Sequence, residues 1–325
     1  MTENTMQAIL NRVLLAMSVA IILLDSIWLN VGHFSCDSQA YILPFFLVLP
    51  LCVVSYFYGT VRRDDVLNAV LACSAFLIVF PAGCGLLSYL LVTVAGTRID
   101  MQLAAIDRTI GFSWPSLMAF VSDYPTANAF LKAAYLSVMP QTVVLIFALG
   151  FGKQLAELYR FSLALTIGAI ITLCLWTIAP SFGAFSVYTL PNQVTEKLGL
   201  VLGLDYGHDL VQMLKTGPGL ISPRDLRGIV GFPSYHTLQA LVLMWYARSV
   251  PMLRWPAIAL NTLVLVAIPI QGGHHLIDMF GGTAVALLSI WLAAHVVSVA
   301  EKRAVSSDWP EIDPRPSCKQ SEAIF

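Results

Sequence analysis

The stretch HHLIDMFGGTAVALLSIWLAAHVVSV, residues 274–299, decides the fold. Beyond Asp278 it contains no Asp, Glu, Lys or Arg. It is long enough for a helix, rising about 1.5 Å per residue, to cross a hydrocarbon core of about 30 Å. A second stretch, GFPSYHT at 231–237, also places a histidine, His236, at the start of an apolar run. Ionisable side chains are costly in a membrane, so both starts are candidate functional positions.

The composition favours a membrane protein over a soluble one. Of the 325 residues, 58% are hydrophobic and only 11% are charged, and the mean hydropathy is +0.77. The net charge of −1 and the dispersed basic residues give no sign of nucleic-acid binding. The six cysteines lack the paired spacing of a zinc site or a disulfide framework. We therefore expect no metal and no cofactor.

The apolar segments predict an all-α, polytopic bundle of about six to eight transmembrane helices. We place eight spans, at Val13–Val31, Tyr41–Gly59, Val66–Ala95, Ala127–Gly150, Leu158–Pro180, Ser234–Val250, Trp255–Gln271 and His274–Val299. The first has no small-residue cleavage site and is predicted to be a retained anchor. The third contains PAGCG at 81–85, which predicts a kink or a partly re-entrant segment.

The distribution of lysine and arginine predicts that both termini are cytoplasmic. With that orientation the short outer connections, 33–40 and 272–273, carry no Lys or Arg. The basic residues then expected on the cytoplasmic side are Arg12, Arg62, Arg63, Lys153, Arg160, Arg248, Arg254, Lys302 and Arg303. Residues 1–300 are predicted to form one transmembrane catalytic domain with its signatures at 215–282. Residues 301–325 are expected to form a flexible, polar cytoplasmic tail.

The predicted topology brings the two histidine segments to one membrane face. His236 and His274 begin different helices of a hairpin, on the outer face. Asp278 follows His274 by four residues, so on a helix its carboxylate can hold one imidazole nitrogen. The other nitrogen is then left for nucleophilic attack. Ser234 can cap the helix that follows Pro233 or donate to a ligand nearby, and it is a candidate phosphate ligand. Free backbone N–H groups there also favour a phosphate.

Three cations precede His236 in the outer connection and are candidate phosphate ligands: Lys215, Arg224 and Arg227. The alternative is that they bind anionic lipid headgroups. His275 lies about 100° around a helix from His274, and is either a substrate contact or a loop residue. A functional role is one alternative for Asp25, Asp100 and Asp107, but we favour satisfied interhelical hydrogen bonds or helix-surface charges for them.

Two of these segments resemble the signatures of a known family. Pro233-Ser-Tyr-His-Thr237 and the pattern of His274, Asp278 and Gly282 resemble the second and third signatures of the type 2 phosphatidic-acid phosphatase superfamily. The resemblance covers roughly 215–282. It implies that His274 attacks phosphorus, that Asp278 orients it, and that His236 protonates the leaving oxygen and then deprotonates water or an alcohol.

Two departures from that pattern refine the resemblance. Ile268 stands where many members carry an arginine. In the first signature of the family a lysine is followed seven residues later by Arg-Pro, whereas here Lys215 is followed by Ser222-Pro223-Arg224. The missing arginine, the adjacent pair His274-His275 and the Gly-x-Pro-Ser-x-His form of 231–236 are more similar to the inositol phosphorylceramide synthase branch and its bacterial relatives, which move a phospho-headgroup between lipids. The resemblance implies a membrane-lipid substrate, a lipid or water acceptor, and a site on the periplasmic face of a bacterial inner membrane. Residues 99–114 also resemble an amphipathic stretch of that branch, and we expect an interfacial helix with Trp114 near the headgroups.

Other functions remain as alternatives. One is a simple phosphatase for a lipid phosphate or diphosphate. Others, from different classes, are a membrane transporter whose polar residues line a path and a haem-binding membrane protein. A Soret band in the visible-light spectrum would exclude phosphoryl transfer in favour of haem binding. Retained activity in a variant without His274 would favour a non-catalytic role for that residue.

Overall fold

The structure is a computed structural model, and it describes residues 2–201 and 205–307. Every regular element in these ranges is helical. The helices are α1 (Thr2–Gly32), α2 (Ser38–Phe57), α3 (Asp65–Leu91), α4 (Asp100–Thr109), α5 (Trp114–Ser122), α6 (Pro125–Leu136), α7 (Val138–Phe151), α8 (Leu155–Ile178), α9 (Asn192–Leu198), α10 (Asp205–Thr216), α11 (Tyr235–Ala247), α12 (Pro251–Gln271) and α13 (Leu276–Ser307). The predicted all-α class is confirmed.

Local sequence explains several helix starts. Side-chain oxygens of Asp37, Asp64 and Ser113 accept hydrogen bonds from backbone N–H groups in the first turns of α2, α3 and α5. Pro125 and Pro251 are the first residues of α6 and α12, a position where a missing N–H costs little.

Six helices of the described residues are long and apolar enough to cross a membrane, and a seventh span is formed if α6 and α7 are taken together. The protein is therefore an integral membrane protein. The predicted span 234–250 is helix α11, which has only 13 residues. At 1.5 Å per residue it is about 20 Å long, too short to cross the core alone.

The structure shows a break in the helical spans that the sequence did not predict, between α6 and α7. Helix α3 continues through Pro81 as one helix, so this segment is not re-entrant. Helices α6 and α7 are instead bent by 45° at Ser137. The Ser137 hydroxyl donates to the carbonyl of Ala134 at 2.6 Å, a local side-chain bond that competes with the helical pattern.

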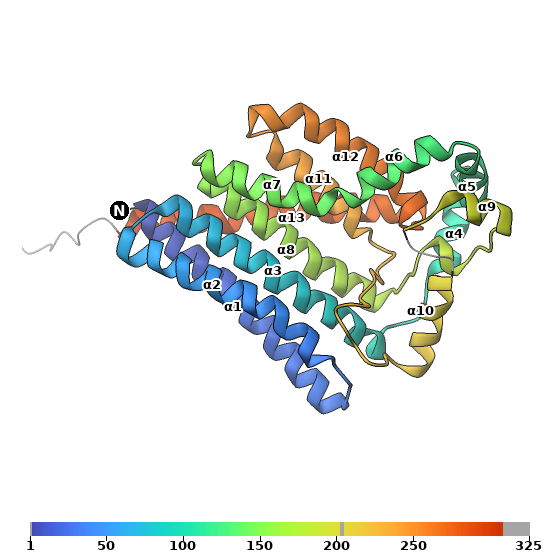
Figure 1. Ribbon diagram of the computed structural model, residues 1–325, viewed down its shortest axis with the longest axis horizontal. Helices are drawn as coiled ribbons and strands as arrows, with labels where there is room; N and C mark the ends of the chain where they lie inside the picture. Colours follow the sequence, from blue (N-terminus) through green and yellow to red (C-terminus); the bar gives the residue numbers. More distant parts are fainter. Residues whose placement is uncertain (1, 202–204, 308–325) are drawn as a thin grey trace, which may run out of the picture.

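The long helices lie side by side, and both described ends of the chain are at one end of the bundle (Figure 1). The short helices α4, α5, α9 and α10 gather at the opposite end, where α12 turns into α13. Termini at a common end are consistent with an even number of passes. The sidedness itself stays a prediction.

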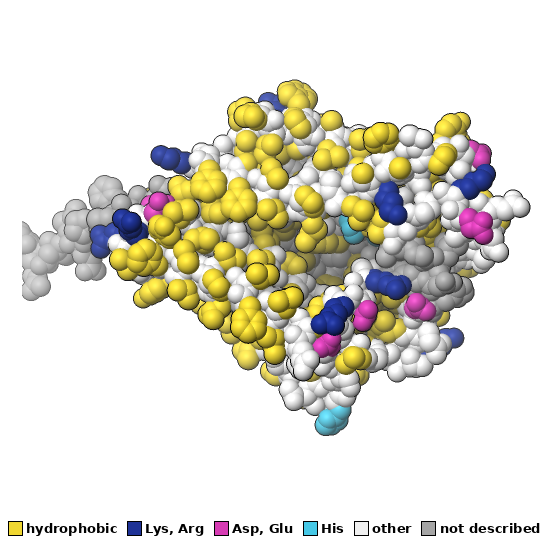
Figure 2. Space-filling model, in the orientation of Figure 1, with side chains coloured by type: hydrophobic (Ala, Val, Ile, Leu, Met, Phe, Trp, Pro, Cys, Tyr) yellow, Lys and Arg dark blue, Asp and Glu magenta, His cyan; other side chains and the backbone are white. Residues whose placement is uncertain are grey.

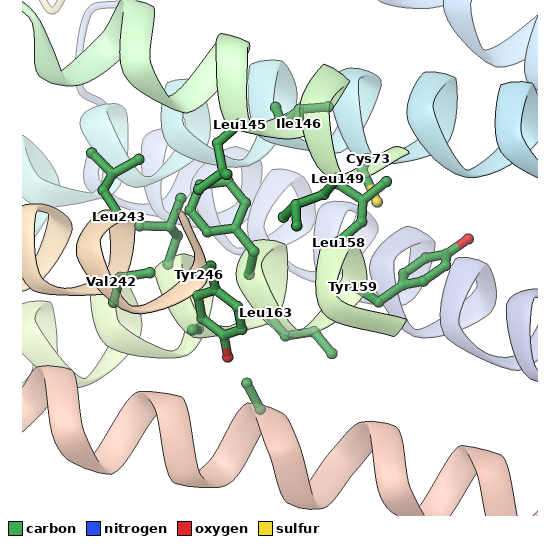
Figure 3. Packing of buried hydrophobic residues seen from close by; sticks show 14 of the residues in the cluster. Cys73, Leu145, Ile146, Leu149, Leu158, Tyr159, Leu163, Val242, Leu243 and Tyr246 are labelled. Atoms are coloured by element: carbon green, nitrogen blue, oxygen red, sulfur yellow. The ribbon is translucent and has the colours of Figure 1, made fainter. Parts of the chain in front are cut away.

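Helix α11 is held in the middle of the bundle by helices α7 and α8 (Figure 3). The packed side chains come from α7, α8, α11 and the neighbouring α3, and include Leu149, Leu158, Leu163, Leu243 and Tyr246. Large apolar side chains also cover the outside of these helices (Figure 2), as expected where lipid replaces water. A rigid core thus positions the helix that carries His236.

One face of the predicted interfacial segment 99–114 packs against the protein, whereas Met101, Ile106 and Ile110 are exposed. The segment forms α4 and the start of α5, and the acids Asp100 and Asp107 of α4 are 1% and 2% exposed. Trp114 is 1% exposed and donates its indole N–H to the carbonyl of Pro269 at 2.7 Å. The Trp114 side chain therefore faces the protein interior and not lipid, and its position relative to the headgroups stays a prediction.

The C-terminal helix extends beyond the predicted start of the tail. Residues 301–307 continue α13, and Glu301 pairs with Arg160 of α8 at 3.0 Å. The rest of the predicted tail, 308–325, lies outside the described residues.

Candidate active site

Ser234 is the N-cap of α11, as the sequence predicts. Its hydroxyl accepts a hydrogen bond from the backbone N–H of Thr237 at 3.3 Å. The Ser234 N–H donates to the carbonyl of Asp278 at 3.0 Å. A Cβ atom at Gly282 would overlap the Ser234 carbonyl oxygen, so only glycine permits this approach of α13. The two histidine segments are therefore in direct backbone contact.

His274 lies in the connection between α12 and α13, directly after Gly273, whose φ is +62°. Its Nδ1 is 3.0 Å from the carbonyl of Gly231 and 3.2 Å from Oδ2 of Asp278. A carbonyl can only accept, so Nδ1 carries the proton and Nε2 does not. Burial lowers the pKa of His274 to about 4, so the ring is neutral at pH 7. Nε2 therefore offers an unshared electron pair.

The unprotonated Nε2 is directed toward the start of α11. It lies 3.5 Å from Oγ of Ser234. The first N–H groups of a helix have no intrahelical partner and favour an anion. A phosphate at this helix start would thus be next to the nucleophilic nitrogen of His274.

His236 is held by Tyr135, a residue that the sequence did not single out. The two rings stack with centroids 4.4 Å apart and an interplanar angle of 18°. The Tyr135 hydroxyl is 3.4 Å from Nδ1 of His236. Tyr135 comes from α6 and precedes His236 by 101 residues, and no local motif marks it. The contact leaves Nε2 of His236 as the nitrogen that can exchange a proton with a ligand.

Comparison with known proteins agrees with this geometry. The family model described as the PAP2 superfamily matches residues 101–292, which include His236, His274 and Asp278. The chain belongs to the PAP2 superfamily. Membership supports a lipid phosphatase-type function. No curated protein and no solved structure matches the chain.

The PAP2 match begins at α4, well before the two signatures, and α4 contacts the site directly. Asp107 accepts hydrogen bonds from the N–H groups of Leu276 and Ile277 at 2.9 and 3.0 Å. His275 is fully buried, with Nδ1 3.4 Å from Asp107 Oδ2. The structure therefore places His275 against Asp107 on the protein interior.

The predicted phosphate ligands of this PAP2 protein lie on or near the connection that leads into α11. Lys215 is in the last turn of α10, and the Arg227 N–H donates to the Tyr89 hydroxyl at 3.0 Å. Lys215, Arg224 and Arg227 are all exposed. Figure 2 shows basic side chains around a hollow in which a histidine is visible. Phosphate binding by these three cations stays a prediction.

Position 268, an arginine in many PAP2 proteins, is apolar and inaccessible here. Ile268 is 0% exposed in the core between helices, and its carbonyl accepts the N–H of Gly272 at 3.0 Å. A cation cannot be placed there without disrupting the packing. Within 2–201 and 205–307, no three His, Cys, Asp or Glu side chains are grouped as metal ligands.

Proposed function

We propose that the protein transfers a phosphate-containing group from a membrane lipid through a phosphohistidine at His274. The observation that carries the proposal is the fixed orientation of His274. Its Nδ1 is held by Gly231 and Asp278 at 3.0 and 3.2 Å, and its Nε2 faces the start of α11. We place the site on the periplasmic face of a bacterial inner membrane, in agreement with the lysine and arginine distribution.

In the first step Nε2 of His274 attacks phosphorus, and the bond from phosphorus to the lipid oxygen breaks. His236, which starts this step as the imidazolium, gives its Nε2 proton to that oxygen as it leaves and becomes neutral. The new positive charge on the His274 ring is stabilised by Asp278, to which Nδ1 donates. The N–H groups at the start of α11 and the exposed cations Arg224, Arg227 and Lys215 stabilise the charge on the phosphoryl oxygens.

In the second step His236 accepts a proton from the hydroxyl of an acceptor. The acceptor oxygen attacks phosphorus, and the bond from phosphorus to Nε2 breaks. His236 thus ends the cycle protonated and His274 ends it neutral. Both a lipid alcohol and water satisfy this balance.

We favour a lipid alcohol as acceptor, and hence headgroup transfer, over hydrolysis. The reason is the missing cation at 268. A phosphate monoester carries about −1.5 to −2 charges at pH 7, whereas a phosphodiester carries one. A site with one cation fewer suits the diester, which is the form of phosphate in a lipid with a headgroup. The alternative is a simple lipid-phosphate phosphatase, which PAP2 membership also supports.

The test supplies purified protein with phosphatidylinositol or phosphatidate labelled at phosphorus, with ceramide, diacylglycerol or no acceptor. We expect label from phosphatidylinositol to appear in a new lipid only when ceramide is present, because transfer to diacylglycerol regenerates the donor. Label released only as a water-soluble phosphate would overturn the transferase assignment and favour the phosphatase. No turnover of either donor would overturn both.

Tyr135→Phe should slow the steps in which His236 moves a proton. The change keeps the stacked ring and removes only the hydroxyl near Nδ1, so the His236 ring is less well fixed. We expect the single-turnover rate of phosphoenzyme formation to fall about tenfold with a lipid substrate and less with a nitrophenyl ester, whose leaving group needs no proton. Equal decreases for both substrates would contradict this role. Phe130→Leu, at an exposed position of the same helix, is the matched control.

A further inference from the structure

Asp107 binds the backbone directly after His274, although it is 169 positions away from Leu276 in the sequence. One of its oxygens accepts the N–H of Leu276 at 2.9 Å and the other accepts the N–H of Ile277 at 3.0 Å. The side chain is buried. These are the first two residues of α13, whose N–H groups have no partner within the helix. A single carboxylate therefore fixes the start of the helix that follows His274.

The same carboxylate contacts His275. Oδ2 of Asp107 lies 3.4 Å from Nδ1 of His275, and neither ring nitrogen has a hydrogen-bond partner among the described residues. Asp107 thus touches three consecutive residues after His274. Its negative charge also complements the positive end of the α13 dipole.

A second acid of α4 binds the loop that contacts the residue before His274. Asp100 precedes Asp107 by two helical turns and is on the same face. Its Oδ1 accepts hydrogen bonds from the N–H groups of Phe182 and Gly183 at 2.8 and 3.0 Å. Asp100 therefore fixes the loop that follows α8.

That loop is hydrogen-bonded to Gly273, the residue before the nucleophile, and to Gly231, whose carbonyl contacts the nucleophile's Nδ1. The N–H of Ala184 donates to the carbonyl of Gly273 at 2.6 Å, and the N–H of Gly231 donates to the carbonyl of Ser181 at 2.7 Å. Gly231 is the residue whose carbonyl accepts from His274 Nδ1. The backbone before His274, the backbone after it and its Nδ1 acceptor are thus all connected to α4.

We propose that Asp107 is a positioning residue for phosphoryl transfer, which fixes the start of α13 so that Nε2 of His274 stays aligned with the start of α11. The inference rests on the proposed function and adds a residue outside both signatures. It assigns to α4 the role of a scaffold for the nucleophile. Misplacement of a reacting group by about 1 Å can cost about a hundredfold in rate. We therefore expect substitution of Asp107 to lower kcat and to leave KM unchanged.

The first test compares Asp107→Asn with the wild-type enzyme, using phosphatidylinositol and phosphatidate labelled at phosphorus. The amide keeps one acceptor oxygen but turns N–H donors toward the N–H groups of α13. We expect kcat and the single-turnover rate of phosphoenzyme formation to fall about 10- to 100-fold, with KM unchanged. The single-turnover rate counts only folded, reactive molecules, so partial unfolding does not imitate the result. The control is Asp123→Asn, which changes an exposed acid at the C-cap of α5.

A second variant removes the donor instead of the acceptor. Leu276→Pro deletes the N–H that Asp107 accepts, at the first position of α13, where proline is tolerated. Leu276→Ala keeps the N–H and controls for the lost side chain. We expect Leu276→Pro to lower kcat more than Leu276→Ala does, and to have a smaller effect when Asp107 is already Asn.

The outcomes separate this inference from the proposed function. If the wild-type enzyme forms no phosphoenzyme with either donor, the proposed function fails. If the wild-type enzyme forms it and Asp107→Asn forms it equally fast, only the positioning role is refuted. Additive effects of Asp107→Asn and Leu276→Pro would likewise refute the role, because the two changes would then act independently.

Discussion

His274→Gln is expected to abolish turnover, with a decrease in kcat of about 10³-fold or more. Glutamine keeps the polarity of the position but has no nitrogen that can attack phosphorus. The Nδ1 contacts to Gly231 and Asp278 show how narrowly the ring orientation is specified. The measurement is the steady-state rate with a phosphorus-labelled lipid donor, in protein whose folding is checked by thermal unfolding.

The control for this change lies on the same helix. His295 is an exposed histidine of α13 that stacks on Trp291 with ring centroids 6.1 Å apart, and it belongs to neither signature. His295→Gln should therefore leave kcat unchanged. A large decrease in His295→Gln, or a small one in His274→Gln, would contradict the assignment of the nucleophile.

His236→Ala should separate the two halves of the reaction. Without the acid, a lipid alkoxide leaves slowly, and we expect a decrease in kcat of about 10²- to 10⁴-fold with a lipid donor. With a nitrophenyl ester the leaving group needs no proton, so the phosphoenzyme should still form. Its breakdown should be slow, because no base deprotonates the acceptor.

The phosphoenzyme is therefore expected to accumulate in His236→Ala supplied with the nitrophenyl ester, seen as a burst of nitrophenol followed by slow turnover. An equally slow burst with both kinds of donor would contradict the acid–base role. His236→Asn is a useful second variant because asparagine is larger than alanine and preserves more of the packing against Tyr135.

Much of the fold could be predicted because lipid imposes a simple rule on sequence. Backbone polar groups in hydrocarbon must be satisfied within a helix, so apolar length alone marks the spans. The rule was less informative at α11, which has 13 residues, whereas the predicted span 234–250 also included Ser234 before the helix and residues 248–250 after it. It also missed the break at Ser137, which separates α6 from α7, whereas Pro81 is accommodated within α3.

The site was predictable where its residues are close in sequence and unpredictable where they are not. His274 and Asp278 are one helical turn apart, so their contact follows from helix geometry. Tyr135 and Asp107 reach the site only through tertiary packing, and nothing in their local sequence differs from a membrane-facing tyrosine or a surface acid. The same holds for the exposed cations Lys215, Arg224 and Arg227, because the distance between these side chains and a phosphate is set by the position of a bound ligand and not by local sequence.

A phosphohistidine at His274 can be detected by rapid acid-free quenching of the enzyme during turnover of a phosphorus-labelled lipid, followed by mapping of the bound label. We expect label that is stable in base, is lost in acid, and is attached to His274. We expect none on His274→Gln. Absence of label in a wild-type enzyme that turns over the donor, or label that persists in His274→Gln, would contradict a phosphohistidine at this position.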